Sequence, residues 1–473
     1  MILLHKKNGS YCLFVKTEKE PNMNSNDQNK TRQILQVNFI RYLKKYSKSL
    51  SLPEKKFLQD ICLGILKSSS VINHQIAQRL HEQITLKKTC ERFTRHLSKE
   101  RLGKELQRVT IRKQCREFDD ETGIIVDDSD IIKSKAKKME GLQKVRDGST
   151  GRYDQSGYNL LNIISYQKRE EGYEIKPISS DLIACNLEMD SLSQIVEDRL
   201  IEITMAGKGR GVFLFDRGFD DKKLFSFLRD HELNFIIRLT CRRSLIVDNI
   251  EQPFMTVAKS IKFTHHLKVP GSDQQIRCGI KRVQVRTDPH PKKHPETTEA
   301  WLVVARFFSH DKNKEGYFYF LCDFPGQPDL SKLAIMKKVV SMYKARWKIE
   351  EVHKQIKQDY SWESIQLTSY TRLKNMNQLL LIAICYLYSL KRYVHIFLET
   401  FPSVMKYCNS RWKKIYDFSY YRLSKLVQIC FVSVTRYNIN PYAGKWLVWG
   451  DRRFDTNGQN GERLIGKAFE VVF

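Results

Sequence analysis

The chain has 473 residues and is 41% hydrophobic, which argues against a disordered protein and predicts two or three domains. Lys and Arg total 81 against 53 Asp and Glu, so the formal net charge of +28 favours a polyanionic partner, duplex nucleic acid before a membrane surface. A charge reserve for solubility is the other explanation. The 11 cysteines are scattered without a C-x-x-C pair, which argues against a disulfide framework or zinc ribbon and favours a reducing cytoplasm.

Residues 1–50 are predicted to form a leader and an N-terminal arm. The first residues, MILLHKKNGSYCLFVK, contain only short apolar runs, which is not typical of a signal peptide. Translation could begin at Met1 or at Met23. The longest apolar stretch, LLLIAICYLYSL at 379–390, is shorter than the ~20 residues of a membrane span and predicts a buried helix.

Residues 51–118 have a helical pattern and are predicted to form a DNA-binding domain. Three helical segments between Leu52 and Leu97 are spaced like a helix-turn-helix unit. The last segment would enter a groove of DNA with Lys87, Lys88, Arg92 and Arg95. A plain helical bundle explains the same pattern equally well.

Residues 119–240 change to a strand-rich pattern. Three strands are followed by a helix, a strand, a second helix and a strand, at 122–128, 157–167, 173–183, 190–206, 212–216, 220–230 and 234–239. This order is that of a ribonuclease-H-like α/β core, with a mixed sheet covered on both faces.

The helix that closes such a core does not follow directly after the strand at 234–239. Further strands fill 241–330, which predicts a β-rich insertion within the core. A helical pattern returns at 331–360, and this segment is assigned to the closing helix. Residues 361–473 are predicted to form a C-terminal helical region.

Two apolar strands end at carboxylates, in GIIVDDSD and VFLFDRGFD, and place Asp127 and Asp216 at one edge of the sheet. A third acid from a helix packed across them would complete the oxygen site that Mg²⁺ prefers. We expect Glu350 in that role. Asp128 is the alternative to Asp127 as the first acid. Strand-end aspartates of turns and a surface salt bridge of Glu350 are the structural explanations.

The helix expected over 343–357, YKARWKIEEVHKQIK, carries Glu350 on a polar stripe. At about 100° per residue its members fall within a sector about 80° wide, opposite an apolar side that can pack. The stripe comprises Tyr343, Arg346, Glu350, Lys354 and Lys357. Glu351 points roughly 100° away from Glu350 and is expected to tolerate substitution.

The stripe matches Y-x2-R-x3-E-x6-K, and the chain therefore resembles the insertion sequence 4 family of bacterial D-D-E transposases. The resemblance includes DRGF after the second-acid strand, VDDSDIIKSKAKKMEG at the first acid and the position of the β-rich insertion. It covers roughly residues 50–390.

The resemblance implies that Asp127, Asp216 and Glu350 bind two Mg²⁺ ions, with Mn²⁺ as a substitute, for in-line phosphoryl displacement. Tyr343, Arg346 and Lys357 would hold DNA phosphates or an unstacked end, with Lys354 beside them. Trp347 would stack on a base or pack beneath the helix. A run of four lysines after the first acid is a DNA-facing segment or a solvated basic turn: Lys133, Lys135, Lys137 and Lys138.

The function expected is therefore a cut-and-paste DNA transposase that binds terminal inverted repeats, cleaves the ends and joins them to target DNA. The resemblance further implies a homodimer on DNA, with a cytoplasmic, nucleoid-associated location and without a membrane or small-molecule partner. A metal-dependent nuclease of the same fold and a transposase-derived DNA-binding protein without catalysis are the two alternatives.

Overall fold

The computed structural model describes the backbone of residues 2–7, 10–15, 25–146, 151–169, 172–187, 191–268, 275–287, 296–308 and 315–391, with a few positions between 423 and 431. Strands β1 (Ile2–Lys7) and β2 (Ser10–Val15) pair as an antiparallel hairpin. The statements below refer to the described residues.

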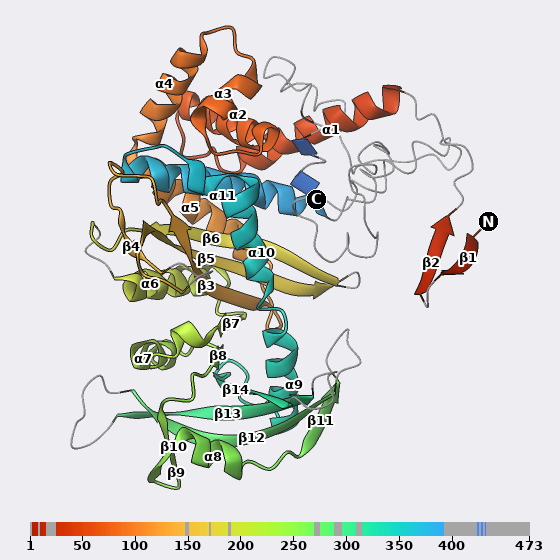
Figure 1. The fold of residues 1–473 in the computed structure, drawn as a ribbon, viewed down its shortest axis with the longest axis vertical. Coiled ribbons are helices and arrows are strands. Elements are labelled where there is room, and N and C mark those ends of the chain that lie inside the picture. Colours follow the sequence, from red (N-terminus) through yellow and green to blue (C-terminus); the bar gives the residue numbers. More distant parts are fainter. Residues whose placement is uncertain are drawn as a thin grey trace.

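Helices dominate the first part of the chain after that hairpin, as predicted for residues 51–118. They are α1 (Ser25–Lys44), α2 (Leu52–Ser68), α3 (Asn73–Leu80), α4 (Leu86–Leu97) and α5 (Glu100–Cys115). Helix α2 begins at a capping box, in which the Ser51 backbone N–H donates to the Glu54 carboxylate at 2.9 Å. Helix α11 (Tyr370–Ser389) contacts α2, α4 and α5 on one side and strand β6 on the other, so it joins the helical part to the sheet (Figure 1).

A mixed sheet forms the centre of the molecule. Its first strands are β3 (Gly123–Ile132), β4 (Gln143–Val145), β5 (Gln155–Arg169), β6 (Gly172–Ile183), β7 (Val212–Phe215) and β8 (Phe235–Arg238). Strands β3, β7 and β8 run parallel, whereas β5 is antiparallel to β3 and to β6. The neighbours therefore follow the order β6-β5-β3-β7-β8. All the strands predicted between 122 and 239 are confirmed.

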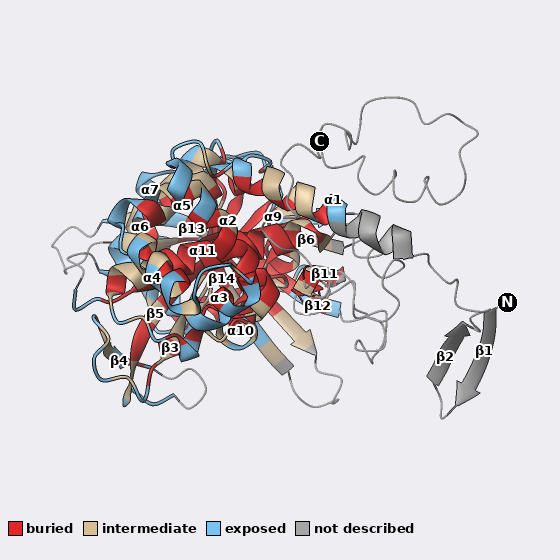
Figure 2. Ribbon diagram, turned by 90° about the horizontal axis from the view of Figure 1, so that it is seen from above, coloured by how far each residue is buried: buried red, intermediate tan, exposed pale blue. Residues whose placement is uncertain are grey.

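Both faces of this sheet are covered, as the order of strands and helices predicted. Ile125 of β3 and Leu214 of β7 belong to a core cluster shared with α9 (Lys332–Tyr343), α10 (Lys348–Lys354) and α11. Val126 and Phe215 belong to a second cluster with α6 (Leu192–Ala206), α7 (Lys222–Asp230) and α8 (Phe254–Ser260). Figure 2 shows buried residues through the centre of the molecule and exposed residues on the outer sides of α5, α6 and α7.

Strands also fill most of residues 241–330, the segment predicted to be a β-rich insertion. Its strands are β9 (Ser244–Val247), β10 (Ile250–Pro253), β11 (His265–Lys268), β12 (Gln275–Arg286), β13 (Thr297–Phe308) and β14 (Glu315–Asp323). Strand β14 pairs with β8, so the insertion continues the central sheet instead of forming a separate one.

The prediction of one regular helix over 343–357 is wrong. Helix α9 (Lys332–Tyr343) ends at the tyrosine, and α10 (Lys348–Lys354) is followed by a π-helix at Gln355–Asp359. Between them the backbone N–H groups of Ala345, Arg346 and Lys348 donate to carbonyls three residues earlier, which tightens the chain into successive turns.

Helix α11 contains the long apolar stretch and is buried along most of its length. None of the described helices is long and apolar enough to cross a membrane. Most of residues 392–473, including much of the predicted C-terminal helical region, lie outside the described residues.

Candidate active site

Asp127 and Asp216 lie on adjacent parallel strands. Val126 of β3 pairs with Phe215, the last residue of β7, so the two aspartates follow at neighbouring positions. Strand alternation places them on the same face as Ile125 and Leu214, the face covered by α9 and α10. Two sequence segments far apart in the chain thus present carboxylates to the helix that carries Glu350.

One arginine joins the three predicted acids. The Arg346 guanidinium is 3.1 Å from Asp127 Oδ2, 3.9 Å from Asp216 Oδ2 and 2.7 Å from Glu350 Oε1. Its side chain is 14% exposed, and that of Glu350 is 60% exposed. The cluster of acids therefore has a buried cation at its centre and one carboxylate toward solvent.

The two aspartates differ in their proton affinity. Burial raises the pKa of Asp127 to about 7, although Arg346 opposes this effect, and the nearby Asp128 and Asp216 carboxylates raise it further. Burial also raises the pKa of Asp216, but Arg346, the Arg217 backbone N–H and Tyr343 outweigh it, so the net pKa lies below its ordinary value. Asp127 therefore binds a proton more readily than Asp216.

Tyr343 and Lys357 each contact a carboxylate of the strand ends. The Tyr343 hydroxyl donates to Asp216 Oδ1 at 2.8 Å, and its ring packs against Phe320 with centroids 4.7 Å apart. Lys357 Nζ lies 3.2 Å from Asp130 Oδ1. The polar members of the signature therefore face the acidic strands, as an active-site wall requires, and their contacts in this structure are with protein carboxylates.

The other two residues predicted beside the acids are exposed. Trp347 is 44% exposed, with Lys348 Nζ 4.9 Å from its ring centroid, so it is not packed beneath the helix. Lys354 is exposed at the end of α10. Both positions are accessible to a nucleic acid.

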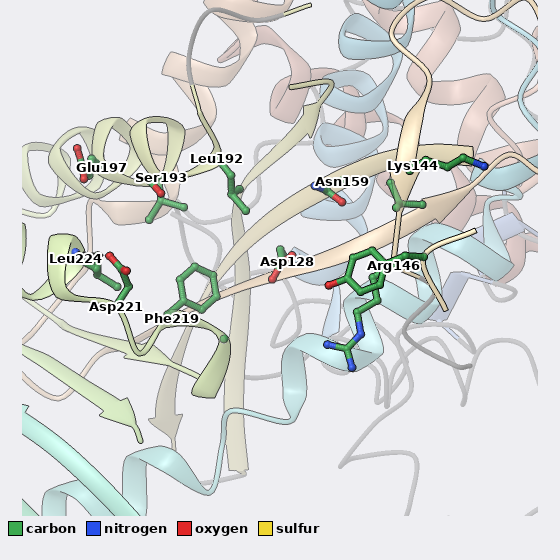
Figure 3. Close-up of a pocket in the computed structure, with 14 residues that line it drawn as sticks. Asp128, Lys144, Arg146, Asn159, Leu192, Ser193, Glu197, Phe219, Asp221 and Leu224 are labelled. Carbon is green, nitrogen blue, oxygen red and sulfur yellow. Dashed lines mark hydrogen bonds between the residues drawn. The ribbon is translucent and has the colours of Figure 1, made fainter. Parts of the chain in front are cut away.

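Asp128 points away from this cluster. It lines a hollow of about 410 Å³ together with residues of β4, β5, α6 and the segment after β7. In Figure 3 Asp128 lies between Lys144 and Arg146 on one side and Phe219, Asp221 and Glu197 on the other. Asp127 and Asp128 of β3 thus lie on opposite faces of the sheet, and Asp127 is the one beside Arg346.

The basic residues predicted to contact DNA in the helical part differ in exposure. On α4, Lys87, Lys88 and Arg95 are exposed. Arg92 instead forms ion pairs with Asp60 and Glu82, each at 2.7 Å, and holds α4 against α2. Its position in the helical pattern could not distinguish these roles, because its partners come from other segments.

The lysine run after the first acid also divides. Lys133 is buried, and its Nζ donates to the carbonyls of Trp362, Glu363 and Ile365 at 3.3, 2.6 and 2.8 Å. The interpretation of Lys133 as DNA-facing is therefore wrong. Lys135, Lys137 and Lys138 are exposed.

Several residues of the site were missed in the sequence. Arg238, at the end of β8, is 3.7 Å from Asp216 Oδ1, and the strand-end position of an arginine in FIIR was the available signal. Asn162 of β5 pairs with Asp127 of the neighbouring strand β3, and His353 lies on α10. Both are buried, and Asn162 Nδ2 and His353 Nε2 have no hydrogen-bond partner among the described residues. Their polar atoms had no sequence signal.

The acids fit a divalent cation in donor chemistry, because three carboxylates converge on one positive group and carboxylate oxygens are the ligands of Mg²⁺ and Mn²⁺. In the described arrangement they are spread around Arg346, and within the described residues no three His, Cys, Asp or Glu side chains are gathered closely enough to hold a metal ion directly.

The chain has a mixed α/β fold, and its candidate site gathers three carboxylates around one guanidinium beside parallel strands. It is therefore an α/β protein with an acidic site. The chain belongs to the Transposase DDE domain family, whose profile matches residues 120–388, more than half of its length. Among curated proteins, none matches the chain. The family implies an enzyme of nucleic-acid phosphoryl transfer that acts on DNA and uses divalent metal ions.

Proposed function

We propose that this protein is a cut-and-paste DNA transposase of the insertion sequence 4 family. It binds the terminal inverted repeats of its element, cleaves the ends and joins the freed 3′-OH groups to target DNA. The observation that carries this proposal is the contact of one Arg346 guanidinium with Asp127, Asp216 and Glu350. Acids from three separate elements meet at one point on a DDE-family chain.

The strand order supports a ribonuclease-H-like core. Three antiparallel strands are followed by two that continue parallel to the first, in the order β6-β5-β3-β7-β8, with helices on both faces. We assign 119–240 and 331–360 to this core, 241–330 to its insertion, 51–118 to DNA binding and 1–50 to an N-terminal arm. Residues 361–473 are assigned to a C-terminal region that includes the dimer contact.

Asp127, Asp216 and Glu350 would hold two Mg²⁺ ions, or Mn²⁺ as a substitute, which supply Lewis-acid activation and charge neutralisation for phosphoryl transfer. The chain's own side chains prepare this site. The Tyr343 hydroxyl donates to Asp216 Oδ1, and the Arg238 guanidinium places a positive charge near the same oxygen. Lys357 fixes Asp130 farther along β3.

DNA is proposed to reach the site from its solvent side. Glu350 opens to solvent, and Trp347 and Lys354 are exposed nearby, where a ring can stack on a base and an ammonium can meet a phosphate. Exposed Lys87, Lys88 and Arg95 on α4 are the proposed contacts of the helical domain. The ion pairs of Arg92 favour a packing role for it. A nucleoid-associated location follows from this activity.

The decisive test compares Glu350→Gln with the matched variant Glu351→Gln in cleavage of duplexes that carry the element's ends. Glu350→Gln is expected to bind the ends and to lose more than the roughly 10–100-fold that removal of a supporting residue costs. Glu351→Gln is expected to cleave, because it makes the same change in charge at the adjacent position. Burial raises the pKa of Glu351 to about 7, so the amide resembles a form that this side chain already populates.

Full cleavage by Glu350→Gln would remove the assignment of the three acids. Nicked products without joined products from the unaltered protein would favour a nuclease of the same fold. End binding without cleavage by the unaltered protein would favour a DNA-binding protein without catalysis.

A further inference from the structure

Arg346 occupies the position where the three acids converge. Its Nη1 contacts Asp127 Oδ2 at 3.1 Å and Asp216 Oδ2 at 3.9 Å, and its Nη2 contacts Glu350 Oε1 at 2.7 Å. The same side chain thus satisfies carboxylates from β3, from the end of β7 and from α10. It acts as an internal cation that keeps the acids assembled.

A divalent ion and this guanidinium need the same oxygen atoms. A carboxylate oxygen that accepts from an arginine N–H has a lone pair directed at nitrogen, and two cations at such short range also repel each other. Metal binding to the acids therefore requires Arg346 to leave at least part of its contacts. The free energy of breaking them lowers the affinity of the acids for metal.

A DNA phosphate offers Arg346 an equivalent partner. Arginine binds phosphate with two parallel N–H donors, as it binds carboxylates. Arg346 lies in the tightened turns between α9 and α10, and its partner Glu350 is 60% exposed, so the cluster opens to solvent on that side. A phosphate arriving there competes for the guanidinium and leaves the carboxylate oxygens to a metal.

We propose that Arg346 is a positioning residue that occupies the metal site until DNA draws it away, so that DNA and divalent metal bind this protein with positive coupling. The proposal rests on the assignment of the acids made above. By linkage, whatever factor DNA adds to metal affinity, metal adds to DNA affinity. The device prevents the acids from being loaded with metal before a DNA end is in place.

The test measures Mn²⁺ affinity by electron paramagnetic resonance of the free ion, with the full chain alone and with a duplex of the element's end. For the unaltered protein the duplex is expected to raise Mn²⁺ affinity within the roughly 5–150-fold range of allosteric coupling. Arg346→Gln is expected to bind Mn²⁺ roughly tenfold more tightly without DNA and to lose most of the enhancement by the duplex. Arg346→Lys, which keeps the charge but not the fork, is expected to lie between them.

Arg238→Gln is the matched control, because it removes a guanidinium 3.7 Å from Asp216 without breaking the contacts to Asp127 and Glu350. It is expected to retain the enhancement by DNA. A purely structural role for Arg346 predicts weaker Mn²⁺ binding in Arg346→Gln, and that result would overturn the proposal, as would an unchanged enhancement by the duplex.

Asp216→Asn separates this inference from the assignment of the acids. Loss of Mn²⁺ binding in Asp216→Asn, with equal affinities in Arg346→Gln and the unaltered protein, would overturn the coupling and leave the acids as the metal site. Unchanged Mn²⁺ binding in Asp216→Asn would remove the metal site itself, and the coupling with it.

Discussion

Replacing Lys133 by Met tests whether the basic segment after the first acid contacts DNA or supports the fold. Lys133 is 5% exposed, and its Nζ donates to three carbonyls at 362–365, the turn that follows the π-helix. Methionine keeps an apolar stem of similar length but cannot donate. The substitution therefore takes the ammonium donor from the carbonyls of Glu363 and Ile365, whereas the Trp362 carbonyl still accepts from the Ile365 backbone N–H at 3.1 Å.

The size of the effect follows from two opposing contributions. A buried polar group that loses its partner costs about 1–3 kcal/mol, so the two carbonyls together cost about 2–6 kcal/mol. Removing the buried ammonium regains its desolvation free energy. Burial lowers the pKa of Lys133 from 10.5 to about 8, which corresponds to about 3 kcal/mol. We expect a net loss of about 1 kcal/mol in the free energy of unfolding.

Chemical denaturation and DNA titrations at several salt concentrations measure the two alternatives. Lys133→Met is expected to unfold at lower denaturant concentration while its salt dependence of DNA binding stays unchanged. The exposed Lys135, replaced by Met, is the matched control, and if it contacts phosphate the slope of log affinity against log salt should fall by about one. A shallower slope for Lys133→Met with unchanged stability would refute the reasoning.

Two further predictions concern groups beside the acids. Burial, with Lys357 and Arg346 adding to it, lowers the pKa of His353 to about 3, below its unfolded value of 6.5. Its contribution to stability is thus fully present above pH 6.5 and is lost as pH falls toward 3, by about 1.4 kcal/mol per pH unit. In denaturation experiments the free energy of unfolding of His353→Leu should therefore fall less steeply at acid pH than that of the unaltered protein. Parallel pH profiles would contradict this. Tyr343→Phe keeps the ring contact with Phe320 but removes the hydrogen bond to Asp216, so the pKa of Asp216 should rise. Cleavage of the DNA ends should fall about 10–100-fold. The acid limb of the pH profile of cleavage should move to higher pH. An unmoved acid limb would exclude that role.

Much of the secondary structure was predictable because it depends on neighbours in the chain. The apolar runs in β3 and β5, and the apolar faces of α6 and α7, identify strands and helices correctly. The same local pattern failed at 343–357. Helical periodicity there describes which residues are apolar, but the break after Tyr343 and the π-helix at 355–359 have no sequence signal of that kind.

The site shows the same division. Strand ends indicated acids near Asp127 and Asp216, and the spacing of the signature indicated Glu350 as the third. The choice between Asp127 and Asp128 needed the tertiary structure, because alternation separates their faces without saying which face meets α10. Arg92 and Lys133 also resembled their exposed neighbours until distant partners identified them as packing residues.

By itself, the sequence determined the α/β class, the strand-rich segment at 241–330, the basic character and the acids to consider. These depend on composition and on periodicities of two to four residues. The tertiary structure decided that Arg346 stands at the meeting point of the acids. Its contact with Asp127 joins residues 219 positions apart, and only the packing of α9 and α10 on the sheet sets that distance.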